Sequence, residues 1–186
     1  MTKQIMQQLI ISGVGGQGVL FVTRLLAEAA INKGLPVFTS ETHGMAQRGG
    51  TVLSHFKVGD FSSPLIRPQQ ADGLLLLKAE NMAAHGNFLK AGGWVVSNVG
   101  ADGTREKETA VHGVDADTLA QAIGNAKAVN LIVLGFALAQ ADKIEAEEGR
   151  LFCSMTDIES VLKSRFGKNK KMMEASLKAL ESGYKA

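Results

Sequence analysis

Apolar residues along this chain fall into short runs separated by longer segments in which they recur with helical spacing. The short runs, bounded by glycine, proline or polar residues, predict strands over 8–13, 35–40, 51–58, 71–77, 94–98 and 111–114. The spacing of the remaining apolar positions predicts helices over 19–33, 78–90, 115–123, 130–139 and 156–184, the last broken near Gly167. Asp115 or Asp117 is expected to cap the third of these helices. The segments 41–50, 59–70 and 100–108 are expected to be loops.

Strands that alternate with helices predict an α/β fold. We expect a single doubly wound, Rossmann-like domain over residues 1–186, with a mostly parallel sheet and a C-terminal helical tail. The order of strand 8–13, helix 19–33 and strand 35–40 predicts a parallel pair of strands joined by a right-handed crossover.

The composition is that of an ordinary globular protein. Apolar residues make up 45% and charged residues 20% of the 186 positions, which argues against disorder and fibrous folds. The formal net charge is only +2, so no footprint for nucleic acid is present. The densest basic cluster, Lys168, Lys170 and Lys171, is expected to be the solvated start of a helix.

No segment of this sequence resembles a secretory signal or a membrane span, so we expect a cytoplasmic protein without a membrane partner. Cys153 is the only cysteine, which excludes a disulfide framework, a Cys₄ zinc site and an iron–sulfur cluster held by this chain alone. Its apolar neighbours predict an inert core thiol. The four histidines lack metal-ligand spacing, and no metal site is expected.

The segment 13–18 has the form G-x-G-x-x-G and stands between a predicted strand and a predicted helix. Gly13 permits a tight turn, Gly15 lets the backbone approach a ligand closely, and Gly18 lets the helix pack on the strand. Gly16 adds room, and the Gln17 amide is a possible hydrogen-bond donor. The free N–H groups that begin the following helix favour an anion.

Two uses of this glycine loop stay open. One is binding of a phosphate-containing ligand, for which Glu41, 23 residues beyond Gly18, stands where a nicotinamide enzyme holds a ribose. The other is purely structural, with the glycines allowing close packing inside the chain or across an interface between subunits.

The segment 41–50 concentrates polar side chains at the carboxyl end of a predicted strand, where open α/β sheets bind ligands. Arg48, beside Gln47, Gly49 and Gly50, has the fork geometry that clamps a carboxylate or a phosphate. His43 is a candidate proton carrier, although a hydrogen-bonding role in the loop is the commoner use of such a residue. The sequence has no nucleophile elbow, Walker loop or carboxylate pair, so the residues alone indicate binding and not a complete catalytic machine.

Taken together, the segments 13–18 and 41–50 resemble the gamma-type subunit of 2-oxoacid:ferredoxin oxidoreductases. The tail, with Leu177-Lys178-Ala179 followed by Gly183-Tyr184, is similar to the C-terminal helix of that family. The form His43-Gly44-Met45-Ala46-Gln47-Arg48-Gly49-Gly50 most resembles the small (beta) subunit of the indolepyruvate members.

The resemblance implies a division of labour between subunits. In such enzymes a 2-oxo acid adds to thiamine diphosphate and loses CO₂, two electrons pass through iron–sulfur clusters to ferredoxin, and coenzyme A takes the acyl group. Thiamine diphosphate and the clusters are implied on a larger catalytic subunit, and this chain is implied to complete the assembly and to help accommodate coenzyme A. The catalytic residues are not identified by the resemblance.

Two other classes of function remain as alternatives. A stand-alone nicotinamide- or flavin-dependent oxidoreductase would use the same glycine loop, and Glu41 favours it slightly. The absence of a second, substrate-binding domain in this sequence argues against it. A non-catalytic nucleotide-binding module is the third possibility.

Overall fold

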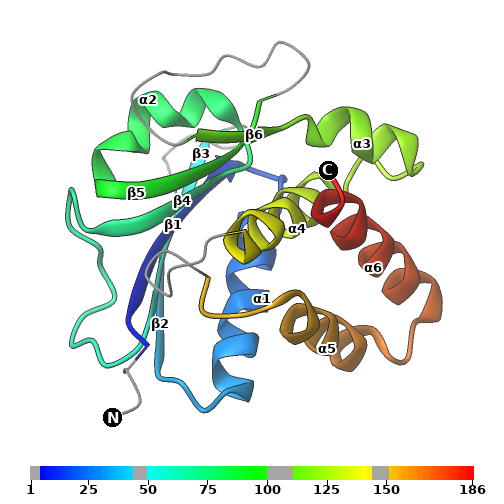
Figure 1. The fold of residues 1–186 in the computed structure, drawn as a ribbon, viewed down its shortest axis with the longest axis horizontal. Coiled ribbons are helices and arrows are strands. Elements are labelled where there is room, and N and C mark those ends of the chain that lie inside the picture. The colour runs from blue at the N-terminus through cyan, green and yellow to red at the C-terminus, as the bar shows by residue number, and fades with distance from the viewer. Residues whose placement is uncertain (1–4, 44–49, 100–110, 144–150) are drawn as a thin grey trace.

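The computed structural model describes residues 5–43, 50–99, 111–143 and 151–186 of the chain. Strands and helices alternate through these residues (Figure 1). The strands are β1 (Gln7–Val14), β2 (Val37–His43), β3 (Thr51–Val58), β4 (Ala71–Leu76), β5 (Leu89–Asn98) and β6 (Val111–Val114). The helices are α1 (Val19–Asn32), α2 (Met82–His85), α3 (Ala116–Ala122), α4 (Val129–Asp142), α5 (Met155–Phe166) and α6 (Lys170–Tyr184), with 3₁₀ turns η1 (Ala79–Asn81) and η2 (Gly86–Phe88) on either side of α2.

The six strands form one mixed sheet in the order β2-β3-β1-β4-β5-β6. The strands β1, β4, β5 and β6 run parallel to one another, whereas β3 is antiparallel to both of its neighbours. This confirms the predicted α/β fold with a mostly parallel sheet. The predicted pairing of the first two strands is wrong, because β3 lies between β1 and β2 and separates them by two strand spacings.

Both faces of the sheet are covered, and the side chains of each strand alternate between the two layers (Figure 1). Leu9 and Ile11 of β1 pack in the larger cluster with α1, α4, α5 and α6, while Ile10 faces the smaller cluster with Met82 and Phe88. The period of two along each strand explains this division. Because both faces are buried, the neighbouring strands β1 and β4 contain uninterrupted apolar runs, Leu9–Ile11 and Leu74–Leu76.

The helix α4 lies between the sheet and α6 and is buried on all sides, as the apolar run 130–139 predicts. It packs directly against α6 through two glycines. A Cβ at Gly135 would stand 2.0 Å from the Leu180 carbonyl oxygen, and one at Gly183 would stand 1.9 Å from the Ile132 carbonyl oxygen. The two backbones therefore approach more closely than any side chain would allow.

Some of the helix ends lie where the sequence predicts them. Asp115 caps α3 by accepting a hydrogen bond from the N–H of Thr118 at 3.0 Å. The predicted C-terminal helix is broken at Gly167, which follows α5 directly. The predicted helix over 78–90 is wrong, because these residues form only the short turns η1, α2 and η2 before β5 begins at Leu89. This crossover needs to span only one strand spacing, since β5 lies beside β4.

Candidate functional site

The glycine loop between β1 and α1 is held by packing at two of its glycines. A Cβ at Gly13 would stand 2.9 Å from both Gln17 Oε1 and Val19 Cγ2. Gly18 has a φ of 83°, and a Cβ there would stand 2.1 Å from the Nδ2 atom of Asn130. Gly16 also has a positive φ, 93°, but its missing side chain would meet open space. The loop therefore needs glycine at 13 and 18 for space, and at 16 and 18 for backbone conformation.

Several polar groups of the loop are bonded within the chain. The side chain of Gln17 accepts from the N–H of Val14 at 2.9 Å and donates to the carbonyl oxygen of Leu77 at 3.3 Å. The N–H of Gln17 donates back to the carbonyl oxygen of Val14, and the N–H of Gly15 donates to the carbonyl oxygen of Gly50 at 3.1 Å. These N–H groups are not available to a phosphate in this conformation, so the loop is braced as a structural turn between β1, β4 and the segment before β3.

The predicted residues of the second motif lie along and beyond the edge strand β2. Glu41 is exposed and pairs in register with Ser54 of β3, and the backbone of His43 ends the strand. Gln47, Arg48 and Gly49 lie outside the described residues. Gly50 lies beside Gly15, so the structure brings the end of this motif to the glycine loop. It does not bring Glu41 beside β1, because β3 lies between the two strands.

Two asparagines near the glycine loop were not expected from the sequence. Asn130 begins the buried part of α4 and lies against Gly18, with its Oδ1 accepting from the N–H of Leu131 at 2.8 Å. Asn98, the last residue of β5, donates to Asp117 at 2.8 Å and accepts from the N–H of Ala116 at 3.1 Å. Asn98 and Asn130 are polar residues that border apolar runs. That position in the sequence could have identified them as candidates.

A second polar cluster lies on the opposite face of the sheet, beneath α2. The hydroxyl of Ser12 is within 2.8 Å of His85 Nδ1 and accepts from the amide of Asn81 at 2.9 Å. Burial lowers the pKa of His85, which favours the neutral ring, and the Nε2–H tautomer can accept from Ser12. Ser12 is fully buried, which makes this cluster a link between α2 and β1 and not an accessible nucleophile.

The remaining chemical groups add no catalytic set within the described residues. Burial raises the pKa of the Cys153 thiol to about 12, and its buried position agrees with the predicted core thiol. No group of three or more histidine, cysteine, aspartate or glutamate side chains in residues 5–43, 50–99, 111–143 and 151–186 is placed to hold a metal ion. None of the helices described by the structure is long and apolar enough to cross a bilayer.

Comparison with known proteins gives matches along almost the whole chain. Residues 8–186 match the family model described as pyruvate ferredoxin/flavodoxin oxidoreductase. The chain is 30% identical to indolepyruvate oxidoreductase subunit IorB of Archaeoglobus fulgidus, over 95% of this chain and 92% of that protein.

Two solved structures share the fold. The gamma subunit of a keto/oxoacid ferredoxin oxidoreductase from Geobacter sulfurreducens matches with a TM-score of 0.74 and 24% identity, covering 96% of each chain. The 2-oxoglutarate:ferredoxin oxidoreductase of Magnetococcus marinus, solved with 2-oxoglutarate, coenzyme A and succinyl-CoA, matches with a TM-score of 0.75 and 19% identity, covering 96% of this chain and 30% of that one. With this fold and a family match over residues 8–186, the chain belongs to the pyruvate ferredoxin/flavodoxin oxidoreductase family.

Proposed function

We propose that this chain is the small subunit of an indolepyruvate-type 2-oxoacid:ferredoxin oxidoreductase and is inactive by itself. The observation that carries the proposal is the alignment with subunit IorB, which spans nearly the full length of both chains. The proposed reaction is the oxidative decarboxylation of a 2-oxo acid, with an aryl pyruvate as the preferred substrate. Coenzyme A accepts the acyl group, ferredoxin accepts two electrons, and the enzyme works in the cytoplasm.

The residues of this chain do not fit the cofactors of that reaction. Iron–sulfur clusters are bound by several cysteine thiolates, and this chain has only the buried Cys153. We therefore place the clusters, and thiamine diphosphate, which supplies the decarboxylation chemistry when bound, on a larger catalytic subunit. The role proposed for this chain is to complete the assembly and to contribute to the binding of coenzyme A.

The surface proposed for that role is the junction of the two sequence motifs. The Gly15–Gly50 hydrogen bond holds the glycine loop beside the end of segment 41–50. Gly15 and Gly16 are exposed there, so a second backbone or a ligand can approach closely. We propose that Gly13, Gly15, Gly16, Gln17, Gly18, Glu41, His43, Gln47, Arg48, Gly49 and Gly50 form or support this junction.

The geometry supports this function better than a stand-alone nicotinamide enzyme. In a dinucleotide-binding fold the acidic residue follows the strand next to the glycine-loop strand. Here β3 occupies that place, and Glu41 lies one strand farther away.

The test is purification of the tagged chain from its native cells under anaerobic conditions, with mass and cofactor analysis of what accompanies it. We expect a stoichiometric larger chain with thiamine diphosphate and iron, and coenzyme A-dependent reduction of ferredoxin with aryl pyruvates in preference to pyruvate. Recovery of the chain alone with a bound nucleotide would contradict the proposal and favour the stand-alone enzyme. A complex that prefers another 2-oxo acid would contradict only the substrate assignment.

A further inference from the structure

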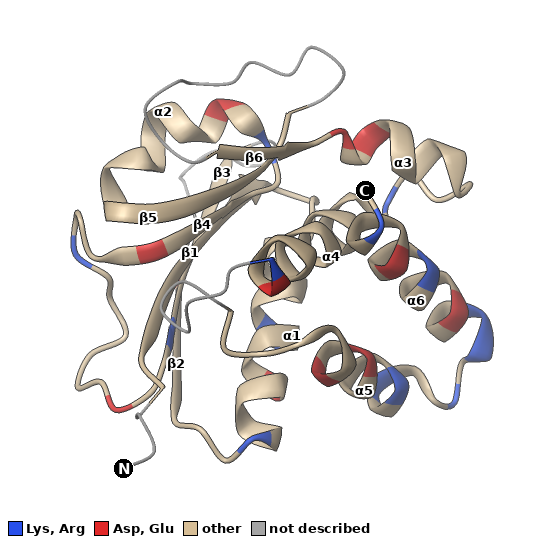
Figure 2. Cartoon of the chain, viewed as in Figure 1, with Lys and Arg blue, Asp and Glu red and all other residues tan. Residues whose placement is uncertain are grey.

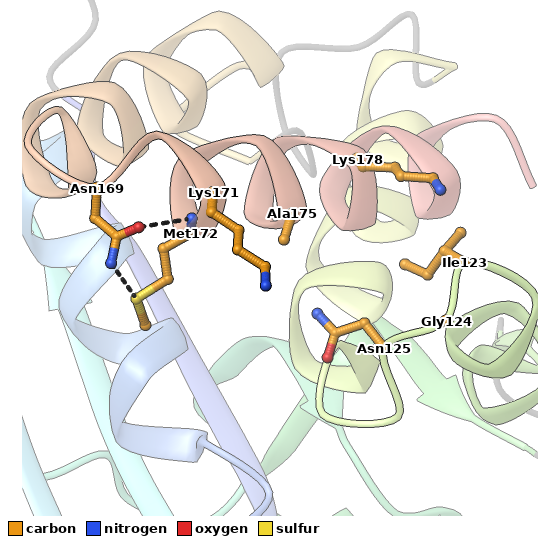
Figure 3. A pocket seen from close by; sticks show the side chains of 8 residues that line it. All are labelled: Ile123, Gly124, Asn125, Asn169, Lys171, Met172, Ala175 and Lys178. Atoms are coloured by element: carbon orange, nitrogen blue, oxygen red, sulfur yellow. Dashed lines mark hydrogen bonds between the residues drawn. The ribbon is translucent and has the colours of Figure 1, made fainter.

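A groove of about 400 Å³ lies between α6 and the turn that joins α3 to α4, far along the chain from the two sequence motifs (Figure 3). Lys171, Ala175 and Lys178 lie on one side of it, at the spacing of a single helix face. Ile123 and Asn125 lie on the other side, and Lys171 points toward Asn125 in Figure 3. The groove thus combines an apolar floor with a cationic rim.

The apolar part of the groove is open to solvent. Met172, which lines it, is 52% exposed although it is a large apolar side chain. Ile123 and Ala175 are half-buried beside it. An exposed thioether next to aliphatic side chains suits contact with an apolar side chain of a partner, because methionine adapts its shape to what it packs against.

The lysines of the rim have no carboxylate partner in the part of the chain that the structure describes. Lys171 and Lys178 are both exposed and take part in none of the ion pairs found there. Glu174 stands four residues before Lys178 on the same helix, yet the two side chains are not within ion-pair distance. Within the described residues, both lysines therefore have their ammonium groups free for a carboxylate of a partner, although α6 also carries Glu174 and Glu181, and acidic and basic residues alternate along it (Figure 2).

The charged residues at the start of α6 also destabilise the helix by itself. The helix begins with Lys170 and Lys171 and has no acidic residue in its first turn, although the helix dipole disfavours cations there. The neighbouring helix α5 follows the favourable order, with Asp157 in its first turn and Lys163 and Arg165 in its last (Figure 2). A cost of this kind is offset when anionic groups of a partner lie over the start of α6.

From this groove we infer a docking site for an acidic segment of the larger subunit, whose carboxylates pair with Lys171 and Lys178 and whose apolar side chain contacts Met172. The inference rests on the proposed function for the existence of that subunit. We expect a permanent partner and not a transient one. A permanent partner offsets the unfavourable interaction of the lysines with the dipole of α6 for as long as the complex exists. The residues that line this groove include none of those that form the Gly15–Gly50 junction.

The test is zero-length cross-linking of the native complex with a carbodiimide. The reagent activates a carboxylate, a lysine amine within ion-pair distance forms an amide bond with it, and the carbodiimide leaves as a urea that has taken up the elements of water. Mass spectrometry should find Lys171 and Lys178 linked to acidic residues of the larger chain. The intrachain pairs Lys163–Glu159 and Lys185–Glu181 provide an internal control, because both must cross-link if the reagent works.

Matched variants measure the contribution of the groove. Replacement of both rim lysines, K171Q/K178Q, should weaken binding of the larger subunit by about fivefold to tenfold at low salt and should flatten its salt dependence. The control K163Q/K185Q removes the same charge elsewhere and should change the Kd by about twofold or less. Circular dichroism checks that both variants fold, which the exposure of all four lysines favours.

The alternative results separate the two proposals. A complex in which the control pairs cross-link but Lys171 and Lys178 do not would overturn the groove assignment and leave the proposed function standing. If K171Q/K178Q and K163Q/K185Q weaken binding of the larger subunit equally, the effect comes from net charge alone, and the groove assignment is overturned as well. If Lys171 and Lys178 form no cross-links, and added coenzyme A protects them from a chemical acetylating reagent, the groove would instead bind a phosphate ligand. If no larger chain is recovered, both proposals fall.

Discussion

The N–H of Gly15 donates a hydrogen bond to the carbonyl oxygen of Gly50 at 3.1 Å, and this contact joins the two motifs that mark the family in the sequence. It exists because β3 pairs with β1 in an antiparallel register that ends with Val14 opposite Thr51. The residue before β3 therefore meets the residue after β1. This hydrogen bond holds the glycine loop against the segment that precedes β3.

Replacement of Gly18 by alanine should destabilise the protein by about 2–4 kcal/mol. The new Cβ would stand 2.1 Å from Asn130 Nδ2, and the φ of 83° is unfavourable for any residue with a side chain. Urea unfolding followed by circular dichroism measures the loss. Gly16→Ala is the matched control, since Gly16 also has a positive φ, 93°, but a Cβ there meets open space, and it should cost only about 1–2 kcal/mol. Equal effects of the two variants would show that contact with Asn130 does not matter.

The contact between α4 and α6 predicts that Gly183→Ala is destabilising by about 1–3 kcal/mol. Alanine favours a helix over glycine by about 1 kcal/mol, so an exposed position would give the opposite sign. At this position the methyl group would meet the Ile132 carbonyl oxygen, which belongs to the backbone and cannot rotate away. Thermal unfolding of Gly183→Ala and of the neighbouring control Ser182→Ala tests this. A stabilised Gly183→Ala would mean that the helices can separate without cost.

Two histidines, the buried His55 and the half-buried His85, predict that stability falls on acidification. The pKa of His85 is lowered by burial, and that of His55 is lowered by burial and then by the charges of Lys57 and His85. Below the ordinary value of 6.5 the unfolded chain therefore binds more protons than the folded chain, and the free energy of unfolding decreases as the pH falls. Urea unfolding between pH 8 and pH 5 measures the slope. His85→Asn should give a shallower slope, and an unchanged slope would contradict this role of His85.

Cys153 should be unreactive in the folded protein. The thiol is buried and its pKa is raised to about 12, so almost no thiolate is present at neutral pH. A chromogenic disulfide reagent at pH 8 should label none of the native chain within minutes and one thiol per chain in guanidinium chloride. Rapid labelling of the native protein would show that the segment around Cys153 opens readily.

The last prediction concerns the proposed binding role of Arg48. Arg48→Ala should raise the KM for coenzyme A or weaken assembly with the larger subunit, because the guanidinium proposed to bind a phosphate or a carboxylate is lost. Steady-state kinetics and the Kd of the assembled enzyme measure the two effects. Arg24→Ala is the control, since Arg24 is exposed on α1 and lies outside both motifs. If the Arg48 variant matches the parent in both measurements, Arg48 has no binding role.

The sequence alone determined the type of most elements and the family of this protein. Alternation of short apolar runs with helical segments was enough for the α/β fold, since both sides of a parallel sheet must be covered by helices. Local chemistry was enough for the break at Gly167 and limited the cap of α3 to Asp115 or Asp117, between which the structure selects Asp115. The spacing of the glycines and the segment 41–50 were enough to identify the family, because such motifs are read without knowing their neighbours in space.

The tertiary structure alone decided what lies beside what. The place of β3 between β1 and β2 depends on long-range pairing that no local pattern specifies, and it moved Glu41 away from the glycine loop and Gly50 toward it. The contact of Asn130 with Gly18 likewise joins residues more than one hundred positions apart. Hydrophobic periodicity reports which face of an element is buried, but not which element covers it, and for that reason the neighbours of each motif had to come from the folded chain.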